Sequence, residues 1–229
     1  MRPTWRNSVN FSFSSALILT ALLLPAQEPN ALERDPKSWI DITPGPRLVG
    51  WTRLNIAPDP LDPVSQWSLL PGGGVLCEGN RGHEWLRYDK PLDDFVFHVE
   101  FRYTRLEGTP RYNSGVFVRT PPDYSFWNQL QIGASAGGHF FGYTLVDGAR
   151  RRFDLSPRLV DQRVKPAGEW NTLEITARGP VLSAWVNGAV VSEYKYCTLP
   201  SGHLGLEAEG FRIEFRNLKL RLLTAAPIQ

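Results

Sequence analysis

Cysteine is scarce in this sequence, with only Cys77 and Cys197 among 229 residues. Two cysteines are too few for a disulfide scaffold or a structural zinc site, so the fold must rest on a hydrophobic core. A hydrophobic content of 42% allows one. Because the two cysteines lie far apart in the chain, they can pair across the fold or remain two buried thiols, and the sequence leaves both possibilities open.

An excess of charge of either sign is also missing, because 25 Lys and Arg stand against 23 Asp and Glu. Nucleic-acid binding needs clustered positive charge, so the balance argues against a nucleic-acid partner. The only dense basic run extends from Arg150 to Arg152. A run of this kind is more often a solvated loop than a binding patch.

Long hydrophobic runs are limited to the N-terminus, where an almost uncharged stretch from Phe11 to Leu24 follows Arg2 and Arg6. The stretch is short for a membrane span, which needs about 20 residues. The pattern predicts a signal peptide over residues 1–26, cleaved after Ala26. The mature protein is then exported to the periplasm or the extracellular space and has no stable membrane span. An uncleaved N-terminal anchor is the alternative.

Residues 27–48 are rich in proline, which lacks a backbone donor and resists regular structure, so we expect a linker there. From Trp67 onward, short apolar runs alternate with polar residues, most clearly from Asp94 to Tyr103. Such alternation predicts half-buried strands, and the Asn187-Gly188 pair predicts a hairpin turn. We therefore expect an all-β sandwich or barrel over residues 49–223, with less than a tenth of it helical and a short tail at 224–229.

Two local features complete this expectation. The one helical candidate is a turn from Asp161 to Val164. In the last strand, Ile213 and Phe215 occupy one parity whereas the later leucines occupy the other. A change of parity needs an extra residue, which predicts a β-bulge at Arg216 or Asn217.

Several short sequence motifs, taken in their order along the chain, resemble those of one family. They are Gly50-Trp51, Gly74-Val75-Leu76, the strand from Asp94 to Arg102, Asn113 through Arg119, Lys165 through Thr172, Trp185 through Gly188, and Glu214 through Asn217. Together they resemble the 3-keto-disaccharide hydrolase domain family from about Gly50 to Leu222. The resemblance implies a two-sheet antiparallel jelly roll of the concanavalin or laminin-G kind. It also implies action on glycosides that are oxidised at carbon 3 of the sugar.

The implied chemistry follows from the ketone, which acidifies the hydrogen at carbon 2. A general base removes that hydrogen, the enolate expels the anomeric substituent, and water adds back. Such a site needs a base, a donor for the enolate oxygen and an acid for the leaving group. The paired carboxylates of ordinary glycosidases are not required.

Strand phase suggests which residues form the site. Glu100, Arg119, Gln129 and Gln131 all lie opposite the aliphatic positions of their own strands, so we expect them to share one concave face. Scattered surface polar residues are the alternative. The resemblance makes Asn113 and Arg119 sugar-facing donors.

Two positions depart from the family pattern. Gln129 stands where the family commonly has Glu, and Glu209 stands where it often has His. An amide cannot act as a base, whereas a carboxylate at 209 can. Glu207 lies two residues earlier, and the two acids could equally be an exposed acidic loop. We therefore expect Glu100 or Glu209 to be the base.

His139 follows two glycines in a predicted loop and is the best histidine candidate for acid-base work. No histidine falls at metal-ligand spacing. No cofactor is evident, a divalent metal is possible for the family, and its ligands are unknown. Tyr143, Phe117 and Trp127 could form an aromatic platform for a sugar. The sequence thus predicts a carbohydrate partner and an exported hydrolase or lyase of 3-keto-glycosides, with a non-catalytic carbohydrate-binding module as the alternative.

Overall fold

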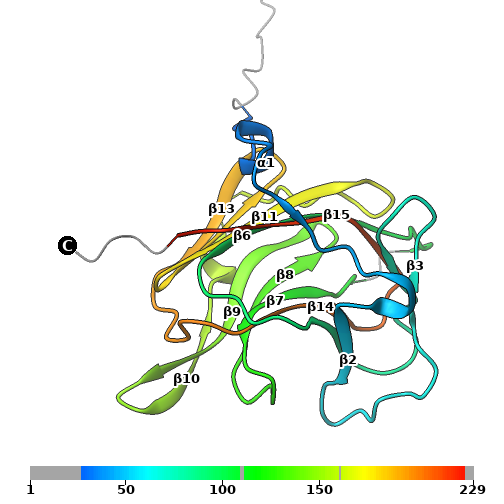
Figure 1. The fold of residues 1–229 in the computed structure, drawn as a ribbon, viewed down its shortest axis with the longest axis horizontal. Helices are drawn as coiled ribbons and strands as arrows, with labels where there is room; N and C mark the ends of the chain where they lie inside the picture. Colours follow the sequence, from blue (N-terminus) through cyan, green and yellow to red (C-terminus); the bar gives the residue numbers. More distant parts are fainter. Residues whose placement is uncertain (1–26, 109–110, 160, 225–229) are drawn as a thin grey trace, which may run out of the picture.

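The computed structural model describes residues 27–108, 111–159 and 161–224. In this part of the chain, two antiparallel β-sheets pack face to face (Figure 1). Helical structure there is limited to α1 (Ala31–Arg34) and two 3-10 turns, η1 (Pro46–Leu48) and η2 (Ser156–Arg158). The prediction of an all-β, two-sheet jelly roll is therefore confirmed. The predicted signal peptide lies outside the described residues.

The first sheet, called sheet A, contains eight strands. In spatial order they are β13 (Ala189–Tyr194), β12 (Val181–Val186), β11 (Asn171–Arg178), β6 (Phe95–Tyr103), β15 (Ile213–Leu222), β4 (Val75–Cys77) and β3 (Trp67–Leu69), with β1 (Ile40–Asp41) paired to β15. The long strand β6 matches the sequence prediction closely, and the Asn187-Gly188 turn joins β12 to β13.

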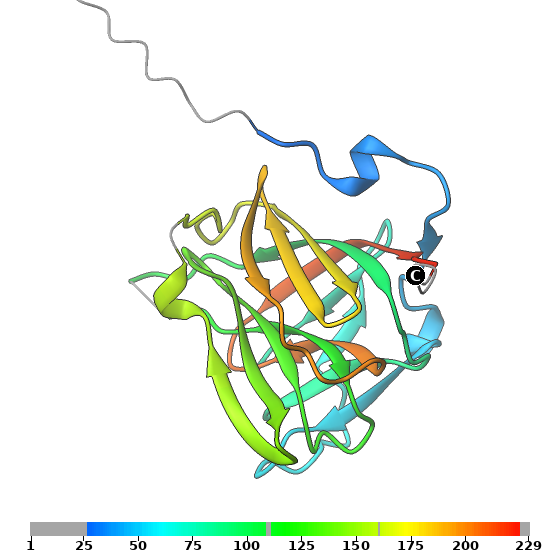
Figure 2. The same cartoon turned by 90° about the vertical axis from the view of Figure 1, so that its left-hand side faces the viewer.

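The second sheet, called sheet B, contains seven strands. In spatial order they are β10 (Ala149–Asp154), β9 (Ala136–Val146), β8 (Asn128–Gly133), β7 (Gly115–Thr120), β14 (His203–Ala208), β5 (Glu84–Tyr88) and β2 (Trp51–Asn55). The turned view in Figure 2 shows the β9–β10 hairpin at one edge of the sandwich. Strand β14 comes from the end of the chain and lies between β7 and β5.

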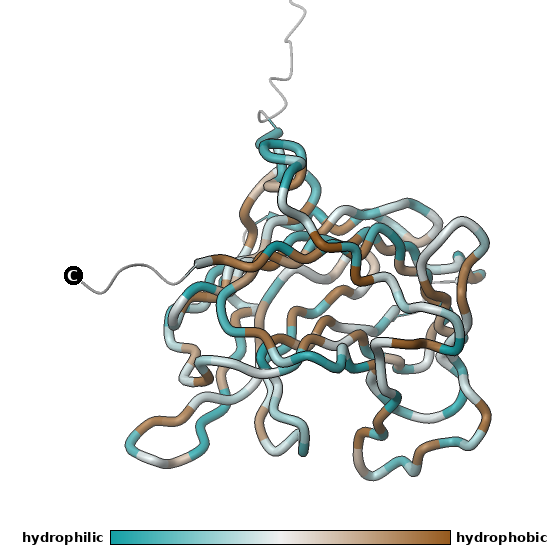
Figure 3. The backbone as a smooth tube through the Cα atoms, in the orientation of Figure 1, coloured by the Kyte–Doolittle hydropathy of each residue, from teal (hydrophilic) through white to brown (hydrophobic). Residues whose placement is uncertain are grey.

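The hydrophobic core lies between the two sheets. Phe97, Val99 and Phe101 point into it from sheet A, and Val116 and Leu130 point into it from sheet B, all fully buried. Alternation explains this arrangement, because successive side chains of a strand leave opposite faces of the sheet. Brown, hydrophobic stretches recur along the strands of both layers in Figure 3.

The predicted bulge in the last strand is confirmed. The register of β15 against β6 shifts between Arg216 and Lys219, and Asn217 adopts a positive φ of 54°. By contrast, the turn expected from Asp161 to Val164 is not helical, and a 3-10 turn occurs earlier, at η2. Pro157 accounts for that position, because its fixed φ suits the first turn of a helix.

Part of the segment expected to be a linker lies against sheet A. Ile40 in β1 pairs with Leu220 in β15. The buried carboxylate of Glu174 on β11 accepts hydrogen bonds from the backbone N–H groups of Ala31, at 2.6 Å, and Leu32, at 3.0 Å. Contacts with the folded unit therefore begin before residue 49.

The two cysteines do not form a disulfide. Cys77 and Cys197 are both free and both buried, and burial raises the pKa of each thiol. They pack as small hydrophobic side chains. No helix among the described residues is long and apolar enough to span a membrane.

Candidate functional site

Aromatic side chains cover part of the outer face of sheet B, the side turned away from the core. Trp85 on β5 and Phe117 on β7 pack edge to face, with ring centroids 5.5 Å apart, and both are fully buried. The segment before β8 covers them, because Tyr124 packs against both rings and Trp127 packs against Phe117. This aromatic cluster forms a buried apolar layer on the outer face of sheet B.

Gly205 on β14 makes room for this cluster. A side-chain Cβ at Gly205 would overlap the Trp85 ring, which is fully buried and cannot move away freely. We expect Gly205→Ala to destabilise the fold by about 1–3 kcal/mol, as overpacking does. Chemical denaturation checks this value, and an unchanged free energy of unfolding would show that the Trp85 ring can move aside.

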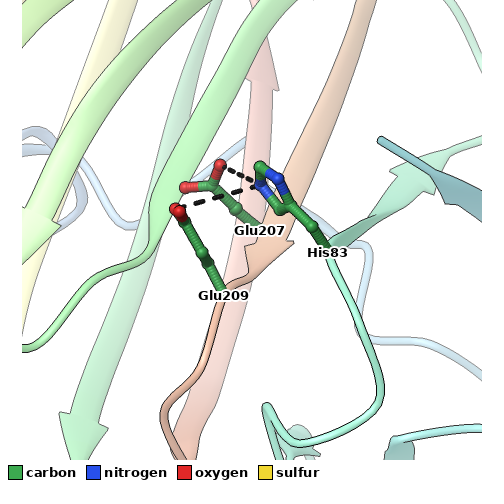
Figure 4. A group of neighbouring side chains, drawn as sticks. All are labelled: His83, Glu207 and Glu209. Atoms are coloured by element: carbon green, nitrogen blue, oxygen red, sulfur yellow. Dashed lines mark hydrogen bonds and ion pairs between the residues drawn. The ribbon is translucent and has the colours of Figure 1, made fainter. Parts of the chain in front are cut away.

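Three ionisable side chains meet beside the aromatic cluster (Figure 4). Glu207 lies on β14, Glu209 follows the end of β14, and His83 precedes β5. The Nε2 atom of His83 is 2.8 Å from Oε1 of Glu207 and 3.9 Å from Oε2 of Glu209. The pairing of β14 with β5 brings them together, although His83 and Glu207 are 124 residues apart.

The three groups differ in their exposure to solvent. The side chain of Glu207 is 3% exposed, that of His83 is 25% exposed and that of Glu209 is 40% exposed. Burial raises the pKa of Glu207, and the hydrogen bond with His83 offsets this only in part. Burial lowers the pKa of His83, but the hydrogen bond and the charge of Glu207 outweigh it, so the pKa is raised overall. Glu207 is therefore the buried partner of the imidazole and Glu209 the more exposed one, and both carboxylates approach the same nitrogen, Nε2.

Side-chain amides extend the site across sheet B. Gln129 on β8 donates a hydrogen bond from Nε2 to Oε2 of Glu207. Gln131, two residues along the same strand, donates from Nε2 to Oδ1 of Asn113, at 2.6 Å. These groups and the ionisable trio line a pocket of about 520 Å³, whose other walls are formed by Ile56, Ala57, Tyr124, Trp127, Phe141 and Arg152.

The structure brings together four of the residues that the sequence proposed for the site. Glu209, Gln129, Gln131 and Asn113 all line this pocket. The two acids near the C-terminus do not form an exposed acidic loop, because Glu207 is buried in the sheet.

Glu100 does not belong to this group, so the predicted convergence is wrong for it. Glu100 lies on β6 in sheet A, whereas the pocket lies on sheet B. Its Oε2 accepts a hydrogen bond from Arg216 at 2.7 Å, and its Oε1 accepts one from Asn217 at 3.3 Å. The phase argument placed Glu100 correctly on an outward face, but that face belongs to the other sheet.

Arg119 is also misplaced by the prediction. Its side chain is fully buried and donates to the backbone carbonyls of Asp93 (2.8 Å), Gly179 (2.5 Å) and Leu199 (3.2 Å). It also forms an ion pair of 2.7 Å with Asp94. The positive φ of Arg119, 49°, interrupts the strand alternation on which the prediction rested. Arg119 therefore joins loops and does not face a ligand.

Of the remaining candidates, His139, Tyr143 and Phe117 do not line the pocket. His139 is in strand β9 rather than in the predicted loop, and its ring centroid is 6.0 Å from that of Phe141. Burial lowers the pKa of His139. Tyr143, on the same strand, packs edge to face against Trp127 at 5.2 Å. Of the predicted aromatic platform, Trp127 lines the pocket and Phe117 is buried beneath it.

Sequence reasoning did not find His83 and gave Glu207 no role. Spacing could not have linked them, because their contact depends on long-range strand pairing. Glu207 supplies a carboxylate in contact with Gln129, and His83 supplies an imidazole beside Glu209.

The trio also has the donor set of a divalent-cation site. His83, Glu207 and Glu209 can offer one nitrogen and two carboxylate oxygens that lie within 4.8 Å of one another. Imidazole and carboxylate ligands suit several divalent metals. These residues therefore fit such an ion.

The fold and the pocket define a jelly-roll domain of the glycoside hydrolase-like or carbohydrate-binding class. The family described as the 3-keto-α-glucoside-1,2-lyase-like domain matches residues 38–221. The chain belongs to this family, which confirms the resemblance found in its sequence motifs. A search of curated proteins found no sequence match.

Solved structures share the fold. A provisionally assigned glycosyl hydrolase from Parabacteroides distasonis superposes with a TM-score of 0.59 and 16% identity, covering 86% of this chain and 100% of that one. The carbohydrate-binding module CBM66 from Bacillus subtilis gives a TM-score of 0.54 and 16% identity, covering 75% and 95%. At this identity, the likeness concerns the architecture alone.

Proposed function

We propose that this protein cleaves 3-keto-glycosides by elimination at carbons 1 and 2 followed by hydration, as a hydrolase or lyase. The observation that carries the proposal is the convergence of His83, Glu207 and Glu209 on one pocket of about 520 Å³. Family membership supports this substrate class, since the domain is described as 3-keto-α-glucoside-1,2-lyase-like.

Glu209 is the proposed general base. It is the most exposed of the three groups, so its carboxylate can reach a sugar in the pocket and take the proton from carbon 2. The electron pair of the broken C–H bond forms the enolate and then expels the anomeric oxygen, which takes up a proton. Addition of water to the resulting double bond completes the hydrolysis.

Three further sets of residues support this step. Glu207 positions His83, whose Nε2 atom also lies 3.9 Å from Oε2 of Glu209, the proposed base. Gln131 and Asn113 offer amide groups in the wall of the same pocket, and such groups hydrogen-bond sugar hydroxyls. Trp127 and Phe141 provide apolar walls against which a sugar ring can pack.

A divalent cation is a second proposed role for the same trio. His83, Glu207 and Glu209 would hold the ion, and a bound ion would act as a Lewis acid on the keto oxygen. Assays with and without a chelator separate the two roles. Cleavage that is lost on chelation and restored by one divalent cation assigns the trio to metal binding, whereas cleavage that survives chelation assigns it to proton transfer.

The alternative function is a non-catalytic carbohydrate-binding module. The amide at Gln129, where the family commonly has Glu, favours it. The assay that decides is incubation of the protein with 3-keto-glycosides that carry a chromogenic aglycone. We expect aglycone release from the 3-keto substrate and none from the parent glycoside, because only the ketone acidifies carbon 2. Binding of the sugar without any release would support the alternative.

Export is proposed as well. The basic start, the short apolar stretch and Ala26 support a cleaved signal peptide and a periplasmic or extracellular location. Sequencing the N-terminus of protein produced in cells should give Gln27 as the first residue. An intact N-terminus would support the anchor instead.

A further inference from the structure

The basic run Arg150 to Arg152 forms strand β10, which lies at the edge of sheet B beside the pocket. The register pairs Arg152 with Tyr143 and Arg150 with Leu145 on β9. Alternate residues of a strand share a face, so Arg150 and Arg152 lie on the outer face of sheet B, whereas Arg151 lies on the opposite face. The run is therefore split between two surfaces.

Arg152 lines the same pocket as His83, Glu207 and Glu209. The guanidinium of Arg150 lies 3.6 Å from the centroid of the Tyr143 ring and 5.6 Å from that of Phe126. Stacking of this kind fixes the direction of an arginine while leaving its edge free to donate hydrogen bonds. Tyr143 in turn packs against Trp127 in the pocket wall.

Within the part of the chain that the structure describes, neither Arg150 nor Arg152 takes part in an ion pair. Asp154, the acid on the same face of β10, accepts a hydrogen bond from the backbone N–H of Ser156 at 2.8 Å. Arg152 thus presents positive charge in the wall of the pocket that also holds Glu207 and Glu209, and Arg150 lies two residues away on the same face of β10.

We infer that Arg150 and Arg152 form a subsite for an anionic substituent of the glycoside, either the carboxylate of a uronic acid or a sulfate ester. This inference rests on the proposed function for the placement of the sugar ring at His83 and Glu207. The substituent lies on the part of the ligand that extends past Phe141 toward β10. A guanidinium can bind either anion through two parallel hydrogen bonds.

Arg151 provides a matched control. It carries the same charge and the same exposure, and it is adjacent in sequence, but it lines a different hollow, between the β9–β10 hairpin and the segment around Tyr196. Arg152 borders both hollows. Arg151→Gln and Arg152→Gln therefore change the net charge equally, and only the second removes a cation from the pocket.

Calorimetric titration with three ligands tests the subsite: maltose, the same disaccharide with a terminal glucuronate, and its 6-sulfate. We expect one of the anionic forms to bind about five- to tenfold more tightly than maltose at low salt, with a smaller preference at high salt. The anionic ligand that binds more tightly shows whether the subsite takes a carboxylate or a sulfate ester. Arg152→Gln and the Arg150→Gln, Arg152→Gln double variant should lose the preference, while Arg151→Gln should retain it.

Equal affinity for all three ligands, no binding of any of them, or a preference that survives the double variant would overturn the inference. Failure of the proposed function gives a different result. If the anionic sugar binds through Arg152 but no 3-keto-glycoside is cleaved, the subsite stands and the enzymatic proposal fails. If neutral and anionic 3-keto-glycosides are cleaved with equal kcat/KM, the enzymatic proposal stands and the subsite fails.

Discussion

Glu209→Gln should lower the rate of aglycone release from a 3-keto-glycoside by about two to four orders of magnitude, the range expected for loss of a general base. The amide keeps the size and polarity of the side chain but cannot accept the proton from carbon 2. Glu209 is partly exposed and follows the end of β14, so the substitution should leave the fold intact. Initial rates and a thermal melt of the same preparation check both statements.

Two comparisons sharpen this experiment. His83→Asn should also lower the rate strongly, because it removes the imidazole beside the base. Glu100→Gln is the matched control, since it makes the same chemical change on sheet A, away from the pocket. A Glu209→Gln variant as fast as the wild type would remove Glu209 from the mechanism.

Arg119→Met should destabilise the protein by about 3–5 kcal/mol, the cost of breaking a buried ion pair by removing one partner. The guanidinium is fully buried and holds three backbone carbonyls and Asp94 together. Methionine fills a similar volume but leaves those acceptors without their donors. For a domain of this size, the loss corresponds to a fall in Tm of roughly 6–20 °C.

Arg178→Met is the control for this change. Arg178 ends strand β11 and is exposed, so its replacement should alter the free energy of unfolding by less than about 0.5 kcal/mol. Arg119→Lys keeps the charge without the forked geometry, so its free energy of unfolding should lie between those of Arg119→Met and Arg178→Met. If the free energy of unfolding of Arg119→Met lies within about 1 kcal/mol of the wild-type value, other contacts hold the loops in place.

The elements that the sequence predicted well are those whose signal is local. Alternation over nine residues defines β6, and the Asn187-Gly188 pair fixes the β12–β13 hairpin by its backbone preferences. The bulge near Asn217 follows from a change of parity within one strand. Each of these features depends on residues close together in the chain, so no knowledge of the partner strands was needed.

The site was only partly predictable, because it depends on which strands become neighbours. Strand phase shows that Glu100 and Gln129 both face outward, but it does not show that they lie on different sheets. His83 comes into contact with Glu207 only because β5 pairs with β14, which lies more than a hundred residues later in the chain. The prediction for Arg119 was wrong for another reason, because the positive φ of this residue interrupts the alternation of side chains along the strand.

Release of aglycone from a 3-keto-glycoside by the purified protein tests the proposed function most directly. We expect release by the wild type and by Glu100→Gln, and a loss of about two to four orders of magnitude in Glu209→Gln. Equal rates in all three proteins, or no release by the wild type while it binds the sugar, would contradict the proposed function.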